Sequence, residues 1–240
     1  MHIFVTGTDT DIGKTFVTAG LAAVMQSLGY QSGVYKPFQS GAEEKFGFLV
    51  SPDLAYVKKL DLYVETASTY ILKEPTAPLI AAELEGIDVD LNRIVHDFKV
   101  IKNKCETVLV EGAGGLLVPV APKETIADVI KLLNIPALIV TRPDLGTVNH
   151  TLLTINQAKE MGINIAGVIM NRYPEDKDDI AIKTAPRLIE EYSDAKILGI
   201  IPALKNFDTI TPGALIDIFI NCVDIEKVFG LKIPKLNPEY

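Results

Sequence analysis

The chain has 240 residues, of which 48% are hydrophobic and 22% charged, as expected of a globular α/β protein with a full core. The 23 basic and 31 acidic residues give a net charge of -8, which argues against a nucleic-acid-binding surface of the usual basic kind. Two widely separated cysteines, an N-terminus unlike a signal peptide and the lack of any apolar run near the ~20 residues that cross a bilayer predict a cytoplasmic protein with no membrane anchor.

Short apolar runs alternate with longer amphipathic stretches along the chain. The segment 2–6 predicts a buried strand, and 14–29 predicts a helix because its apolar residues recur at helical spacing. Further strands are expected at 32–38, 107–112, 136–141, 165–171 and 197–202, each next to a helix-like segment. Strands that are apolar on both faces and separated by helices indicate a doubly wound, mostly parallel sheet with helices on both faces. The whole chain, 1–240, is expected to form this single α/β domain.

Two segments are less regular than the rest. The segment 41–104 is expected to hold a helical excursion beside the sheet, and 231–240, rich in Pro, Lys and Asn, is expected to be a tail or a peripheral contact. In doubly wound folds ligands bind beyond the carboxyl ends of the strands. The loops that follow the predicted strands carry nearly all the unusual polar and glycine residues, so we expect one site there.

The stretch VTGTDTDIGKT, residues 5–15, lies between the first strand and the first helix and ends like a phosphate-binding loop. Gly13, Lys14 and Thr15 match the pattern G-x-x-x-x-G-K-S/T, but Thr8 stands in place of the first glycine, so the loop is a variant. Backbone N–H groups and the helix dipole would bind phosphate oxygens there. Lys14 would reach the β- and γ-phosphates, and the Thr15 hydroxyl would ligate Mg²⁺.

Two carboxylates in this loop are unusual, because each would repel a polyanion. Asp9 is expected to hold the turn by bonding its own backbone. Asp11, closer to the helix, is expected to face a metal ion or a cationic substrate.

Two later strand ends carry charged candidates. Glu111 in VLVEGAGG stands where phosphoryl-transfer enzymes hold Mg²⁺, and Gly112, Ala113 and Gly114 would let a ligand approach the backbone. Lys36 in YKPFQSG would be a second cation for a transferring phosphate, or alternatively a solvated surface lysine.

Asn171 in IMNRYP stands at another strand end, where its amide could contact a base. Pro174 occupies the position in which guanine-binding proteins have aspartate, which weakly favours adenine. Asp53 in SPDLAY is typical of a helix N-cap region, and its residue type alone indicates no metal role.

Six motifs in this order resemble the dethiobiotin synthetase family: VTGTDTDIGKT, YKPFQSG, EPTAPLIAA, VLVEGAGG, LGTVNHTLLT and GVIMNR. The resemblance extends from Phe4 to about Leu204. It implies a P-loop ligase that uses ATP and Mg²⁺ to close a ureido ring from 7,8-diaminononanoate and CO₂ in biotin synthesis. The implied route runs through a carbamate and a carbamic-phosphoric anhydride. The resemblance also implies a homodimer with the substrate at the interface.

Individual roles follow from the same resemblance. Lys36 and Lys14 would be catalytic, and Thr15, Asp53 and Glu111 would hold Mg²⁺. The residues implied to bind the nucleotide and its metal are Asp11, Ile12, Gly13, Lys14, Thr15, Phe16, Asp53, Glu111, Gly112, Ala113, Gly114, Asn171, Arg172, Pro202, Ala203 and Leu204. Those implied to contact the substrate are Thr10, Ser40, Gly112, Leu145, Gly146, Thr147 and Asn149. The stretch LGTVNH would reach over from the other subunit.

The chain departs from the family pattern at two places. Leu79 stands where the family usually has histidine, and Pro143 and Asp144 precede the shared Leu-Gly at a variable position. One alternative is a switch-type ATPase of the partition or nitrogenase-reductase class. Those proteins carry a second lysine early in the loop, where this chain has Asp9. A non-catalytic nucleotide-binding module is a second alternative, and Pro174 disfavours a GTPase.

Overall fold

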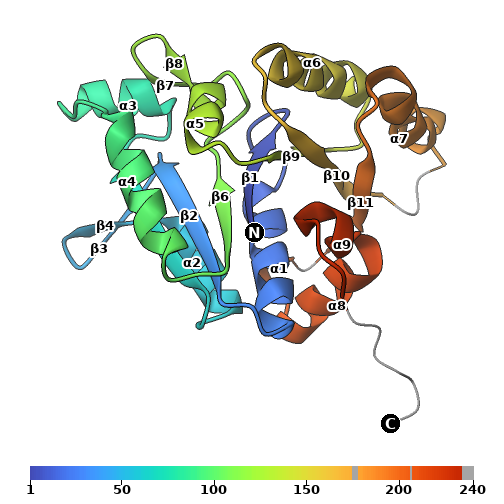
Figure 1. Cartoon of the computed structure of the whole chain (residues 1–240), viewed down its shortest axis with the longest axis horizontal. Coiled ribbons are helices and arrows are strands. Elements are labelled where there is room, and N and C mark those ends of the chain that lie inside the picture. Colours follow the sequence, from blue (N-terminus) through green and yellow to red (C-terminus); the bar gives the residue numbers. More distant parts are fainter. Residues whose placement is uncertain (175–177, 206, 234–240) are drawn as a thin grey trace.

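The computed structural model describes residues 1–174, 178–205 and 207–233 (Figure 1). Its main sheet consists of β1 (His2–Gly7), β2 (Ser32–Gln39), β5 (Glu65–Ile71), β6 (Thr107–Glu111), β9 (Ala137–Thr141), β10 (Ile165–Tyr173) and β11 (Ile197–Pro202). The strand order is β11-β10-β9-β1-β6-β2-β5, and every neighbouring pair is parallel. All carboxyl ends therefore meet at one edge of the sheet. The predicted doubly wound α/β fold is confirmed.

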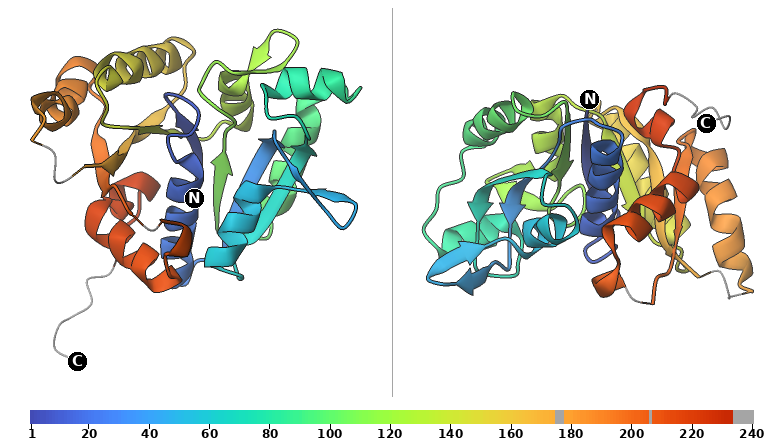
Figure 2. Two further views of the ribbon diagram at one scale, coloured as in Figure 1. Left: turned by 180° about the vertical axis from the view of Figure 1, so that it is seen from behind. Right: turned by 90° about the horizontal axis from the view of Figure 1, so that it is seen from below.

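Helices cover both faces of this sheet (Figure 2). One face carries α1 (Lys14–Ser27), α2 (Pro52–Leu60), α8 (Pro212–Cys222) and α9 (Ile225–Phe229). The other carries α3 (Pro78–Leu84), α4 (Leu91–Lys102), α5 (Ile126–Leu133), α6 (Thr147–Glu160) and α7 (Ile180–Ser193). Successive strand residues alternate between the faces: Val5 packs in the first core and its neighbour Phe4 in the second. This is why the strands are apolar at nearly every position.

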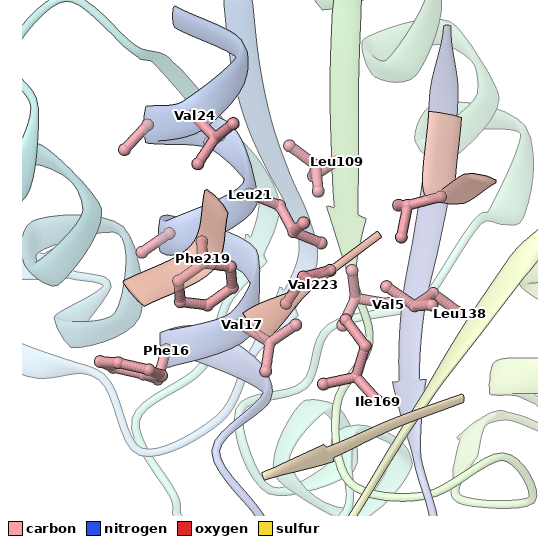
Figure 3. Packing of buried hydrophobic residues seen from close by; sticks show 14 of the residues in the cluster. Val5, Phe16, Val17, Leu21, Val24, Leu109, Leu138, Ile169, Phe219 and Val223 are labelled. Atoms are coloured by element: carbon pink, nitrogen blue, oxygen red, sulfur yellow. The ribbon is translucent and has the colours of Figure 1, made fainter. Parts of the chain in front are cut away.

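Helix α1 is buried along most of its length and fixes the loop that precedes it. Val17, Leu21 and Val24 point into the core formed with Val5 and neighbouring strands (Figure 3). Each such side chain contributes about 1.5–3 kcal/mol when fully buried. The start of α1 is therefore held rigidly against the sheet, and with it the phosphate-loop residues.

The segment 41–104 is more than the helical excursion that was expected. It begins with an antiparallel hairpin, β3 (Glu43–Lys45) and β4 (Phe48–Val50), and it contains the edge strand β5 in addition to α2, α3 and α4. Strand β5 has the sequence ETASTYI, and only Tyr70 in it is fully buried. A strand exposed at an edge needs no continuous apolar run, so the pattern that identifies the central strands is missing here.

Smaller features include a short 3-10 helix, η1 (Phe207–Thr209), before α8. Strands β7 (Pro119–Ala121) and β8 (Glu124–Thr125) form a second short hairpin ahead of α5. Of the segment expected as a tail, Leu231 and Ile233 pack against the core around α1, and 234–240 lie outside the described residues. None of the helices in the described part has the length and apolarity needed to cross a bilayer.

Candidate active site

The loops at the carboxyl edge of the sheet enclose a cavity of about 1030 Å³. Most of the residues proposed from the sequence line it: Thr10, Asp11, Gly13, Lys14, Thr15, Phe16, Lys36, Ser40, Asp53, Glu111, Gly112, Ala113, Gly114, Asn171, Arg172, Pro202, Ala203 and Leu204. Ile12 is buried beneath the loop instead. The topology thus brings together side chains from five strand ends and from the start of α2.

The phosphate loop curls tightly before α1 because two of its residues adopt left-handed backbone conformations. Asp11 has φ 55° and Gly13 has φ 89°. A side chain on Gly13 would also place its Cβ 2.1 Å from Asn171 Nδ2, so glycine is required there on two counts. Lys14 is buried and its Nζ donates to the Asp9 carbonyl at 2.9 Å. Burial lowers the pKa of Lys14 to about 8, against the opposing attraction of the Glu111 carboxylate.

Asp9 holds the turn, as expected. Its Oδ1 accepts the Thr10 N–H at 2.8 Å, and its Oδ2 lies 3.4 Å from Arg142 Nη2. Arg142 also contacts Asp144 through Nε at 3.1 Å, which links the phosphate loop to the loop ahead of α6. Asp11 is exposed and lines the cavity.

Lys36 is the centre of a buried ionic cluster. It is 5% exposed, and its Nζ lies 2.5 Å from Asp53 Oδ2 and 2.7 Å from Glu111 Oε1. The hydroxyl of Thr15 donates to the same Glu111 oxygen at 2.8 Å. Burial by itself would lower the pKa of Lys36, but the carboxylates of Glu111 and Asp53 outweigh burial and raise the pKa above its ordinary value. Lys36 is therefore a buried, protonated cation, and the alternative of a solvated surface lysine is wrong.

Asp53 is positioned in this cluster by the N-terminal cap of α2. The Ser51 hydroxyl caps α2 by accepting the Leu54 N–H at 3.1 Å, and it also donates to Gln39 Oε1 at 2.5 Å. Since Gln39 lies on β2 three residues after Lys36, this bond docks the start of α2 against the strand that carries Lys36. Asp53, in the first turn, then faces Lys36.

Two buried oxygens at the site have no hydrogen-bond partner within the described residues: Glu111 Oε2 and Ser40 Oγ. A buried carboxylate oxygen without a partner is costly, and a cation would satisfy it. Mg²⁺ binds through one or two carboxylates together with phosphate oxygens and water. The donors Thr15, Asp53 and Glu111 therefore fit Mg²⁺.

Some cavity residues were not found from the sequence. Tyr56 and Phe207 line the cavity together with Phe16 and Leu204, so this part of the cavity wall is largely aromatic and apolar. Tyr56 lies one helical turn after Asp53, and that spacing could have identified it. Pro75, Thr76 and Ala77, together with Pro78 at the start of α3, also line the cavity. Leu79, next to Pro78 on α3, is half-buried.

The four residues around the start of α6 lie apart from the cavity. Leu145, Gly146, Thr147 and Asn149 are not among its described lining residues. Leu145 is 90% exposed, and Asn149 is exposed in the first turn of α6. Gly146 is the N-cap and provides no side-chain cap. Thr147 is buried, and its hydroxyl forms a hydrogen bond with that of Thr141 at 2.8 Å.

This fold and site define the class of the protein. A parallel sheet, a glycine-lysine-threonine loop at the start of a buried helix and a strand-end carboxylate beside the threonine are the features of a P-loop nucleotide-binding protein. A protein-family model described as an AAA domain matches residues 1–211.

Curated relatives resolve the class further. An ATP-dependent dethiobiotin synthetase BioD of Anoxybacillus flavithermus is 40% identical over 206 residues, which cover 85% of this chain and 92% of the relative. The proteins of the same name from Bacillus licheniformis and Bacillus subtilis strain 168 are 42% and 40% identical, over 85% of this chain and 86% and 87% of theirs. The chain belongs to the dethiobiotin synthetase family and is an ATP-dependent ligase.

Solved structures of other proteins share the fold. The MinC:MinD cell division protein complex of Aquifex aeolicus matches with a TM-score of 0.60 and 19% identity, covering 98% of both chains. A ParA family ATPase of Chlorobium tepidum matches with a TM-score of 0.52 and 17% identity, covering 96% of this chain and 93% of its own. These similarities extend to the fold alone, so they do not support the switch-ATPase alternative as a function.

Proposed function

We propose that the protein closes the ureido ring of dethiobiotin from 7,8-diaminononanoate, CO₂ and Mg-ATP. The observation that carries this proposal is Lys36, a buried cation held between Asp53 and Glu111 and beside the phosphate loop. A reaction that passes from a carbamate to a carbamic-phosphoric anhydride develops negative charge where such a cation lies. Fixed positive charge in a desolvated site stabilises that transition state more than the ground state.

The cavity residues divide the work of such a reaction. The loop N–H groups and Lys14 would bind the β- and γ-phosphates, and the phosphates would keep Lys14 protonated. Thr15, Asp53 and Glu111 would hold Mg²⁺, which when bound neutralises phosphate charge. Lys36 would lie near the carbamate oxygen that attacks the γ-phosphorus as ADP leaves. Since the pKa of Lys36 is raised, it acts as a fixed charge and not as a base.

Ring closure needs no protein nucleophile. The second amine attacks the carbonyl carbon of the anhydride, phosphate leaves, and the amine loses its proton. The chain has to hold both amines near the anhydride and keep water out. Ser40, whose buried hydroxyl has no partner in the described chain, would bond the substrate in this part of the cavity.

The substrate's carboxylate end would be bound by a second copy of the chain. The start of α6 is exposed and separate from the cavity, and a helix N-terminus favours a carboxylate. In a homodimer, the exposed Leu145, Gly146 and Asn149 of one subunit would reach the substrate in the other. Thr147, also expected to contact the substrate, is instead buried and bonded within its own chain. We place the enzyme in the cytoplasm, where ATP and reduced cysteines are found.

The test is an omission series with purified protein. The cyclic urea product, detected by mass, should form only when the diamine, CO₂ and Mg-ATP are all present, and ¹³CO₂ should label the urea carbonyl. ATP hydrolysis that proceeds equally well without the diamine, with no cyclic product, would overturn the proposal and favour a switch ATPase.

A further inference from the structure

We infer that Asn171 and Arg172 are positioning residues that hold the phosphate loop by two successive carbonyl groups. The inference rests on the proposed use of ATP at this site. It assigns to these residues a role beyond bordering a base, namely presenting the loop's N–H groups to the phosphates.

Asn171 is the first tie. It is 3% exposed, and its Nδ2 donates to the Ile12 carbonyl at 2.9 Å, across 159 positions of sequence. The amide lies against Gly13 so closely that any Cβ there would collide with it. Strand β10 therefore contacts the loop directly at the residue before Lys14.

Arg172 is the second tie. Its Nη1 donates to the Asp11 carbonyl at 2.8 Å, in a charge-assisted bond. Its backbone has φ 59°, a left-handed conformation that residues other than glycine rarely adopt, and the pairing of β10 with β11 shifts register between Met170 and Tyr173. The strand thus leaves regular geometry at the point from which the guanidinium reaches the loop.

The geometry of the peptide unit explains how bonds to two carbonyl groups orient the N–H groups of the loop. In a planar trans peptide the C=O of one residue and the N–H of the next point in opposite directions. Fixing the Asp11 carbonyl therefore orients the Ile12 N–H, and fixing the Ile12 carbonyl orients the Gly13 N–H. These are the amides immediately ahead of α1, where phosphate oxygens bind in loops of this kind. Asp11 and Gly13 are both left-handed, so the loop needs outside contacts to keep one conformation.

A base-free ligand separates this role from base recognition. Mg-tripolyphosphate has the phosphates of ATP and no adenine. If Arg172 acts through the loop, Arg172→Ala should lower the affinities for tripolyphosphate and for ATP by the same factor. That factor is about tenfold for the loss of one charge-assisted bond. If Arg172 contacts only the base, tripolyphosphate affinity stays unchanged.

The experiment is a calorimetric titration of full-length protein with Mg-tripolyphosphate and with Mg-ATP. Arg172→Gly also loses the guanidinium bond, but glycine adopts the left-handed backbone without strain. If the lost bond and not backbone strain weakens binding, Arg172→Gly and Arg172→Ala should have the same affinities. Arg172→Lys should recover part of the affinity. Arg187→Ala is the matched control, since Arg187 is exposed on α7 and pairs only with Glu191 among the described ion pairs. It should leave both affinities unchanged.

Hydrogen exchange gives a readout without ligand. The Ile12 and Gly13 amides should exchange faster in Arg172→Ala, while the core amides of α1 and β1 stay protected. If Arg172→Ala bound tripolyphosphate with unchanged affinity and ATP more weakly, the inference would be overturned and the proposed function would remain intact. If the unmodified protein bound neither ligand, the proposed function and the inference would both fail.

Discussion

The two halves of the candidate site are built differently. Around the phosphate loop, Lys14, Lys36 and Glu111 are buried. Lys36 bonds Glu111 directly, Lys14 bonds the Asp9 carbonyl, and β10 contacts the loop through Asn171. Around the start of α6, Leu145 and Asn149 are exposed and touch none of this network among the described contacts.

The difference indicates that one chain by itself encloses the phosphate half of the site and leaves the substrate half exposed. Burial strengthens electrostatic interactions and prevents reorganisation, which charge stabilisation during phosphoryl transfer requires. The start of α6 and the exposed Leu145 beside it are open to solvent, and they become enclosed only when another surface covers them. Changes in the first half should therefore alter chemistry and stability, and changes in the second should alter substrate binding.

The largest effect is expected from Lys36→Ala. Turnover should fall about 10²–10³-fold, because the fixed charge at the transferring phosphoryl group is lost. The free energy of unfolding should also fall by about 3 kcal/mol, since Glu111 becomes a buried carboxylate without its cation. Lys45→Ala, at an exposed lysine of the β3–β4 hairpin, is the control and should change neither. Near-normal turnover in folded Lys36→Ala would remove Lys36 from the mechanism.

Glu111→Gln should raise the Mg²⁺ concentration needed for half-maximal turnover by at least about tenfold, since an anionic ligand becomes neutral. Asp53→Asn should act in the same direction. The measurement is initial rate against Mg²⁺ at saturating ATP, with Glu43→Gln on the exposed hairpin as control. An unchanged Mg²⁺ requirement in both variants would exclude these carboxylates as ligands.

In the second half, Asn149→Asp should raise the KM for the diamine about tenfold and leave the KM for ATP unchanged. An aspartate in the first turn of a helix favours the helix but repels a substrate carboxylate. Thermal stability should therefore stay equal or rise while substrate binding weakens. If the residue served only the helix, the diamine KM would not move.

The smallest effect lies outside both halves, at His2. The pKa of His2 is lowered to about 4, mainly because the imidazole is partly buried. The nearby positive charges of the N-terminal amino group and Lys102 lower this pKa further. The unfolded chain has a His pKa of about 6.5, so it binds more protons than the folded chain between these values, and stability falls as the pH drops through that window. The melting temperature of His2→Gln should decline less between about pH 7 and about pH 4.5 than that of the unmodified protein. Equal declines would contradict this.

Much of the fold followed from patterns in the sequence, because strands buried on both faces carry nearly continuous apolar runs. Strand β5 did not, since it lies at the sheet edge and six of its seven residues are only partly buried. Lys14, Lys36 and Glu111 could be proposed one by one from motifs, and Asp53 only from the family resemblance. The contact between Lys36 and Asp53 could not, because it depends on how Ser51 docks α2 against Gln39.

The ties from β10 to the phosphate loop show the same limit. Asn171 and Arg172 were proposed to border the nucleotide, yet their contacts with the Ile12 and Asp11 carbonyls span about 160 positions and depend on a left-handed backbone at Arg172. No local pattern marks a left-handed arginine within a strand. The prediction that these residues contact adenine stays open to test.

The division of the site between two chains is tested most directly by mixing subunits. Lys36→Ala is defective in the phosphoryl half and Asn149→Asp in the substrate half, so each alone should be poorly active at limiting diamine. In a randomly reassorted mixture half the dimers are mixed, and one of their two sites carries neither change, so about a quarter of the unmodified activity should return. Activity that stayed at the average of the two variants would mean that each chain completes its own site, and would contradict the account.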